Sequence, residues 1–233
     1  LDVNERHHGI VMAIAVEALV KLFALIAVGA FVVWGISGGV WEALDRIDAS
    51  RVAELPMNGG RWTAITFISA AAFVCLPRMF QVLVVENEHE THLRTASWAF
   101  PAYVLLMSLF VVPIAVIGLE ILPVGSNPDL FVLSLPLHVG NEGLAILSFL
   151  GGFSSATSMV IVASIALSTM VSNHIVMPLW LRFGAGGASV SGDVRKVILF
   201  SRRASIAAVL FLGYSYFVLS GGGSALAAIG LVS

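Results

Sequence analysis

The chain contains 233 residues, of which 58% are hydrophobic and 11% are charged, and its formal net charge is -2. Its mean hydropathy is +0.97. These values lie outside the range of soluble globular domains, and the near-neutral charge excludes the basic surface that is typical of nucleic-acid-binding proteins. The single cysteine, Cys75, excludes an internal disulfide framework. The composition therefore predicts an integral membrane protein.

Long apolar stretches divide the chain into candidate membrane-spanning helices. A span needs about 20 mostly apolar residues to cross about 30 Å of hydrocarbon, and a helix satisfies its own backbone hydrogen bonds in lipid. Five such stretches are complete and a sixth begins; they cover residues 10–34, 62–85, 98–122, 143–171 and 200–219, with the sixth starting near Ala225. Because the chain opens on Leu1 and stops within this short last run, we expect it to be a fragment of a longer polytopic protein.

The first stretch carries two opposite charges. Glu17 and Lys21 are four residues apart with the acid first, which puts them on one helical face in the favourable order for an ion pair. One such charge alone near the middle of a membrane costs about 2.5–3.5 kcal/mol, so we expect the two to neutralise each other and to face protein. They are candidates for a gate or pathway, and the alternative is a buried pair that only fixes helix packing.

Two later features mark connections and bends. After the first stretch, Trp41, Leu44 and Ile47 lie near one helical face among charges, which is typical of a short helix on the membrane surface; an ordinary solvated helix is the alternative. In the second stretch Pro77 and Gln81 are one turn apart, and we expect them to bend the helix and to line an inner vestibule. Pro113 predicts a kink in the third stretch.

The fourth stretch contains the segment GGFSSATSMVIVASIALST, residues 151–169. All eight hydroxyl residues from Ser154 to Ser172 fall on one half of a helical wheel, and Gly151, Ser154, Ser155 and Ser158 share an arc of about 100°. Hydroxyl and carbonyl oxygens can replace the hydration shell of a hard cation, and a glycine pair weakens the helix locally. The alternative is that small residues and hydroxyls only let helices pack closely.

The lysine and arginine residues predict the orientation. If residues 1–9 are cytoplasmic, then residues 86–97 and 173–199 are cytoplasmic too, and most basic residues lie on that side. The cytoplasmic set is Arg6, Arg78, Arg94, Arg182, Arg195, Lys196, Arg202 and Arg203, against Arg46, Arg51 and Arg61 on the outer side. This asymmetry agrees with the positive-inside rule and predicts a multi-pass protein of the cell (inner) membrane.

The hydroxyl-rich segment resembles the sodium-site helix of the sodium/solute symporter family. By that resemblance Ser154 and Ser155 match the paired hydroxyl ligands, and Gly151 matches a position that offers its backbone carbonyl. AIAVEALVKLFALIAVGAFVVWG and LAAIGLVS resemble the family's sixth span and the opening of its eleventh. The resemblance implies an all-α, leucine-transporter-like inverted-repeat bundle and a bound sodium ion. It also implies an incomplete sodium site here, because the family's other ligands come from an early broken helix.

A narrower resemblance concerns two further segments. CLPRMFQVLVVENEHETHLRTASWAFPAYVLLMSLFVVPIA and STMVSNHIVMPLWLR are more similar to the symporter-like membrane module of bacterial sensor histidine kinases than to freestanding symporters. Freestanding symporters usually follow the sodium helix with an acid-containing end, whereas this chain continues Ser168–Thr169–Met170–Val171–Ser172–Asn173. No catalytic kinase motif lies within the sequence.

Three hypotheses about function follow. The first is the transport or sensing module of a two-component sensor histidine kinase, which binds a small solute with sodium. The second is a freestanding sodium/solute symporter for an amino acid, a carboxylate or a sugar. The third is a non-transporting helical membrane scaffold.

No nucleophile with a matching base is visible, so we do not expect an enzyme in this segment. The expected partners are the bilayer, a small solute, the remaining transporter helices and a downstream kinase, with no nucleic acid.

Overall fold

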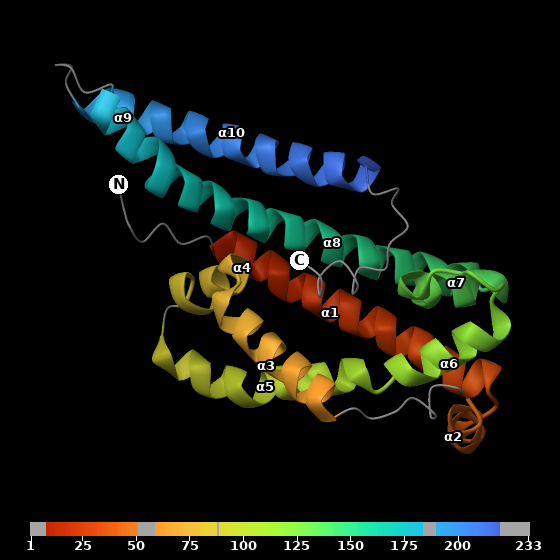
Figure 1. Ribbon diagram of the computed structural model, residues 1–233. Coiled ribbons are helices and arrows are strands. Elements are labelled where there is room, and N and C mark those ends of the chain that lie inside the picture. The colour runs from red at the N-terminus through yellow and green to blue at the C-terminus, as the bar shows by residue number, and fades with distance from the viewer. Residues whose placement is uncertain (1–7, 51–58, 88, 184–189, 220–233) are drawn as a thin grey trace. The chain divides into compact units, whose positions relative to one another are not determined.

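The computed structural model describes residues 8–50, 59–87, 89–183 and 190–219, and within these ranges all regular secondary structure is helical (Figure 1). The elements are α1 (His8–Ala30), η1 (Phe31–Ile36), α2 (Val40–Asp48), α3 (Gly59–Cys75), α4 (Pro77–Phe80), η2 (Gln81–Val85), α5 (Glu90–Ser108), α6 (Val111–Ile121), η3 (Pro128–Leu130), α7 (Phe131–His138), α8 (Glu142–Val171), η4 (Ser172–Val176), α9 (Met177–Phe183) and α10 (Val190–Leu219). Three of the short elements, η1, η2 and η4, are π-helical turns.

Four stretches of the described chain are long and apolar enough to cross a membrane. They are Val11–Ile36, Glu90–Ile121, Glu142–Leu179 and Leu199–Leu219. These correspond to four of the expected spans, so the all-helical class and the membrane-spanning length are confirmed for them. The expected beginning of a sixth span near Ala225 lies outside the described residues, as do residues 1–7 of the expected cytoplasmic N-terminal segment.

The second expected span, residues 62–85, is not one continuous helix. α3 ends at Cys75, Leu76 forms a bend, and a new helical turn begins at Pro77. Proline lacks a backbone N–H and disfavours helical geometry in the residue before it, which accounts for the interruption at Leu76. The 17 residues of α3 extend about 25 Å, less than the hydrocarbon thickness. The bend expected near Pro77 is therefore present, in the form of a break.

The kink expected from Pro113 is also present. α5 ends at Ser108, the chain turns at Leu109 and Phe110, and α6 begins at Val111. Pro113 has no N–H to donate to the carbonyl of Leu109, four residues earlier, so the helical ladder is interrupted there. The ladder resumes when the N–H of Ile114 donates to the carbonyl of Phe110 at 3.1 Å.

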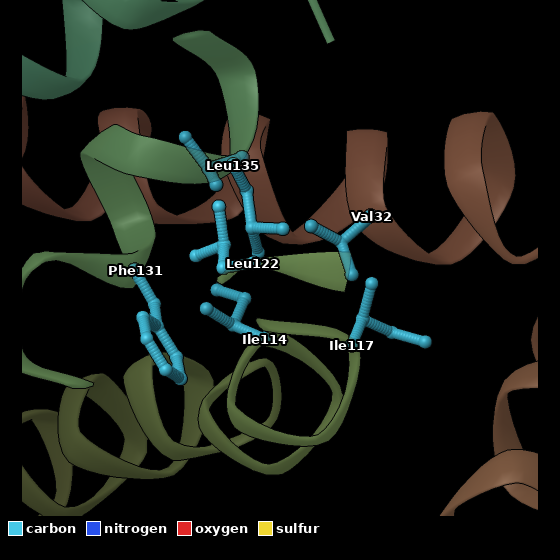
Figure 2. Close-up of a cluster of buried hydrophobic side chains, with 7 residues drawn as sticks. Val32, Ile114, Ile117, Leu122, Phe131 and Leu135 are labelled. Carbon is cyan, nitrogen blue, oxygen red and sulfur yellow. The ribbon is translucent and has the colours of Figure 1, made fainter. Parts of the chain in front are cut away.

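The described chain divides into two compact units. The first contains α1, η1, α2, most of α3, and the chain from α5 to Ser158 in α8. Its core gathers buried side chains of α1, η1, α6 and α7 (Figure 2). They are Val28, Val32, Ile114, Ile117, Leu122, Phe131 and Leu135. The proline-rich connection after α6 is thus not a loose loop, because α7 inserts Phe131 and Leu135 into this core.

The second unit contains the end of α3, α4, η2, and the chain from Met159 through η4 and α9 to α10. Within it α10 packs against η4, the π-helical turn that follows α8. Residues 184–189, which belong to the glycine-rich connection before α10, lie outside the described residues. α10 begins at Val190, so part of the expected cytoplasmic segment 173–199 is helical.

The segment expected on the membrane surface forms α2. Trp41 and Leu44 are exposed, Ile47 is half-buried and Ala43 is buried. α2 packs against α6, and the guanidinium of Arg46 contacts the carboxylate of Glu120 at the end of α6. The helix is therefore confirmed, and its Trp41 side chain is 77% exposed within the described chain.

Candidate functional site

The two charges of α1 lie on the face of the helix that is turned toward protein. The opposite face is a regular stripe of large apolar side chains that are 55–67% exposed: Met12, Val16, Leu19 and Phe23. On the inner face, Glu17 and Lys21 are half-buried, and Ala24 and Val28, which continue the same line, are buried. The expectation that Glu17 and Lys21 face protein is therefore confirmed.

The expected ion pair between these two side chains is not formed. Within the described part of the chain, neither Glu17 nor Lys21 has an ion pair within 4.0 Å or a side-chain hydrogen bond. The spacing of four residues allows the two to meet, but no ion pair within 4.0 Å joins them. Two opposite charges consequently share one inner face without neutralising each other directly.

The hydroxyl face of α8 is also turned inward. Among the hydroxyl residues from Ser154 to Ser172, only Thr157 is exposed; the others are half-buried or buried. On the opposite half, Met159, Val160 and Leu167 are exposed. The two faces that the helical wheel predicts for α8 therefore match its burial: the hydroxyl side chains face protein, and the apolar side chains of the opposite half face outward.

The hydroxyls differ in their hydrogen bonds. Thr157 donates to the carbonyl of Phe153 at 2.7 Å, and Ser168 and Thr169 donate to the carbonyl of Ile165 at 3.0 and 2.9 Å. Such bonds back to the helix occupy the hydroxyl proton. Ser154 and Ser155, by contrast, make no side-chain hydrogen bond to any described residue. Their oxygens are available to a ligand.

The helical backbone at the glycine pair is intact. α8 runs without a break from Glu142 to Val171, so the local loosening that was expected at Gly151 and Gly152 is absent. The carbonyl of Gly151 lies inside the helical ladder and keeps only its second lone pair for another partner. The helical irregularities occur instead at η1, η2 and η4, and π-helical turns of this kind have no simple sequence signal.

Gly151 is the point where α8 approaches α1 most closely among the glycines of α8. A Cβ atom added there would lie 2.8 Å from Cβ of Ala24 and 3.7 Å from Cα of Lys21. Seven residues earlier, Leu144 packs on the core cluster that contains Val28 and Val32. Later residues of α8 therefore lie beside earlier residues of α1, so the two helices are antiparallel here (Figure 1).

The antiparallel arrangement determines which part of α1 the candidate ligands on α8 follow toward. Ser154 and Ser155 come one helical turn after Gly151, and Ser158 comes two turns after it. Because α1 runs the other way, these positions follow Gly151 in the direction of the N-terminal half of α1, which contains Glu17 and Lys21. The sodium candidates and the charged candidates thus all belong to the first unit, in which Gly151 lies close to Ala24 and to the backbone of Lys21.

A tyrosine of α5 also contacts α1 near its charged segment. No pattern in the local sequence predicted this contact. The hydroxyl of Tyr103 donates to the backbone carbonyl of Ala18 at 3.0 Å, across 85 positions of the chain. Ala18 directly follows Glu17, and α5 packs against α1. α1 thus lies between α5 and the first half of α8, with its charged segment level with contacts from both.

The remaining candidate is Gln81. It begins the π-helical turn η2, is half-buried and belongs to the second unit, whereas the other six candidates belong to the first. Neither unit, over its described residues, contains three or more acidic, histidine or cysteine side chains that are placed to hold a metal ion.

The fold and the site together define a class: an all-helical protein, over its described residues, with four helices long and apolar enough to cross a membrane. Comparison with protein-family models, with curated proteins and with solved structures finds no match to this chain.

Proposed function

We propose that the chain is a sodium/solute symporter-like membrane module, in which Ser154 and Ser155 contribute oxygens to a sodium site between α1 and α8. The observation that carries the proposal is the pair of half-buried hydroxyls without hydrogen bonds to the described chain, one turn after the glycine that lies close to α1. Hydroxyl oxygens compensate a dehydrated cation without placing another full charge in the membrane. Ser158, Glu17 and Lys21 would line the pathway to this site.

We further propose that the module senses or transports its solute as part of a two-component sensor histidine kinase. This part rests on the sequence resemblance of residues 75–115 and 168–182. A freestanding sodium/solute symporter for an amino acid, a carboxylate or a sugar is the alternative. The gene sequence beyond residue 233 tests the choice: a dimerisation helix with a phosphoacceptor histidine supports the sensor, and a stop codon soon after the last span supports the carrier.

The sodium site is tested with radioactive sodium on the full-length protein in lipid nanodiscs, because the resemblance implies that a helix outside this chain supplies the other ligands. The unmodified protein should bind ²²Na⁺ in competition with unlabelled sodium but not with equal potassium. The double substitution Ser154→Ala with Ser155→Ala should abolish this binding. Thr157→Ala is the matched control, because it removes a hydroxyl from the same helix whose proton is already committed to Phe153.

Both possible results of the double substitution are informative. Loss of binding with retention in the Thr157→Ala control supports the assignment, provided that both variants unfold at the temperature of the unmodified protein. Equal ²²Na⁺ binding by all three proteins would contradict it, as would a complete lack of sodium binding by the unmodified protein.

One observation favours a second candidate, a helical scaffold without transport. Gly151 is buried against Ala24, and the close approach it permits is what small residues do at packed membrane helices. In such a scaffold the inward hydroxyls would serve packing alone. The sodium experiment separates the two candidates, because a scaffold predicts no sodium binding to any of the proteins.

A further inference from the structure

Arg203 is an exposed charge inside the apolar part of α10. The stretch Leu199–Leu219 is long and apolar enough to cross a membrane, and Arg203 comes four residues after its start. At a rise of 1.5 Å per residue, Arg203 lies about 6 Å from the end of a stretch that is about 31 Å long. Arg203 has no hydrogen bond or ion pair with any described residue.

The residues on the same side of α10 are apolar and exposed. Leu199, Leu210 and Tyr214 fall within about 40° of Arg203 on a helical wheel, and their side chains are 46–68% exposed. Ser201 falls about 160° away and is buried, and α10 packs against η4 within the second unit. Arg203 therefore extends from the side of α10 that is turned away from its buried residue.

The bilayer is the surrounding that this side of α10 fits. Of the four candidate spans, Leu199–Leu219 is the least covered by protein: 6% of its apolar part is buried, against 28% for Glu142–Leu179. Arginine near the end of a span extends along the apolar surface and places its charged end among the lipid headgroups. Its planar guanidinium can donate two parallel hydrogen bonds to a phosphate.

The charge of the neighbouring sequence favours a lipid with a net negative charge. Residues 195–203 contain four basic residues and no acidic residue; the four are Arg195, Lys196, Arg202 and Arg203. The distribution of basic residues predicts that this end of α10 is cytoplasmic, and the cytoplasmic leaflet contains anionic lipids that attract lysine and arginine near the surface. A choline headgroup would instead bring another positive charge to this set.

We propose that Arg203 binds the headgroup phosphate of an anionic phospholipid, whose acyl chain lies along Leu199, Leu210 and Tyr214. This inference goes beyond the proposed function and does not depend on sodium binding, because it requires only that α10 crosses the membrane. A helix outside this chain that covers the same side of α10, with an acidic residue opposite Arg203, is the alternative occupant.

The test measures which lipid lies beside Arg203. In the full-length protein the five native tryptophans of this chain are replaced by phenylalanine, and Phe200→Trp introduces a reporter. Phe200 is 75% exposed and falls about 60° from Arg203 on the helical wheel. The protein is placed in phosphatidylcholine vesicles that contain brominated phosphatidylglycerol or, in parallel, the same fraction of brominated phosphatidylcholine. The ratio of the two quenching strengths reports the local preference for the anionic lipid.

We expect brominated phosphatidylglycerol to quench the reporter more strongly than brominated phosphatidylcholine. Arg203→Gln should lower the preference about fivefold, which is the effect of one basic residue near an anionic surface, and Arg203→Lys should keep most of it. Arg46→Gln is the matched control, because it removes a guanidinium that is already paired with Glu120. It should leave the preference unchanged.

Three results would overturn the lipid assignment, and the first two need no substitution of Arg203. Equal quenching by the two lipids would show that no anionic lipid is selected, and weak quenching by both would show that protein covers this side of α10. Loss of the preference on adding inorganic phosphate at constant ionic strength would indicate a site for free phosphate. None of these results bears on ²²Na⁺ binding at Ser154 and Ser155.

Discussion

The guanidinium of Arg46 lies 3.2 Å from both carboxylate oxygens of Glu120, across 74 positions of the chain. Arg46 comes from the short helix α2 and Glu120 from the end of α6, the helix whose residues Ile114 and Ile117 help to form the core of the first unit. The contact therefore holds α2 against a helix that is itself fixed by packing. It leaves Trp41 on the opposite edge of α2 exposed.

We expect this contact to position α2 rather than to stabilise the whole fold. The two side chains are 37% and 53% exposed, and solvent screens a pair of that kind, so its coupling free energy should stay below about 1 kcal/mol. A double-mutant cycle with Arg46→Ala and Glu120→Ala, followed by equilibrium unfolding in mixed micelles, measures it. Arg46→Ala combined with Glu142→Ala, on α8, should show no coupling. A coupling of several kcal/mol would mean that the pair is desolvated.

A second prediction concerns Gly29 on α1. A Cβ atom there would lie 2.2–2.4 Å from side-chain atoms of Phe110, which is too close for any real contact. Gly29→Ala should lower the free energy of unfolding by about 1–3 kcal/mol, the usual effect of overpacking. Gly213→Ala on α10 is the control, because no atom lies within 4 Å of the added methyl group. Equal stability of the two variants would show that Phe110 moves aside at no cost.

The glycine pair of α8 allows a sharper comparison. Gly151→Ala would place a methyl group 2.8 Å from Cβ of Ala24, and a Cβ atom cannot rotate away, so the two helices have to move apart. Gly152→Ala meets nothing within 4 Å. We expect the first substitution to lower the unfolding temperature and to weaken ²²Na⁺ binding, and the second to do neither. If Gly152→Ala lowers the unfolding temperature and ²²Na⁺ binding as much as Gly151→Ala does, glycine acts through the helix backbone and not through packing against α1.

Local sequence pattern accounts for a definite part of these results. The length and apolarity of the spans, the inward hydroxyl face of α8 and the kink before Pro113 all follow from neighbours within a few turns of one helix. The contacts that build the site do not. Tyr103 reaches Ala18 across 85 positions, and the approach of Gly151 to Ala24 depends on how two helices cross. The break at Leu76 shows a further limit, since an apolar run of sufficient length is still interrupted where proline removes a backbone donor.

The tryptophans provide a test of how the chain lies in the membrane. Trp34, Trp41, Trp62 and Trp98 are 59–77% exposed, and each is near an end of an expected span. Tryptophan prefers the boundary between lipid and water, because its ring is apolar and its N–H seeks a polar partner. We therefore expect these four side chains to lie at headgroup depth. The topology predicted from the basic residues, in which the broken stretch 62–85 also crosses, puts Trp98 on the cytoplasmic side and the other three on the outer side.

Fluorescence quenching of single-tryptophan variants in vesicles measures this arrangement. Lipids brominated high on the acyl chain should quench all four variants more strongly than lipids brominated near the chain end. Iodide added only outside should quench Trp41 and Trp98 to different extents in vesicles of one protein orientation. Strongest quenching of Trp41 from the chain ends would refute its place at the membrane surface, and equal access of iodide to Trp41 and Trp98 would refute the orientation that the basic residues predict.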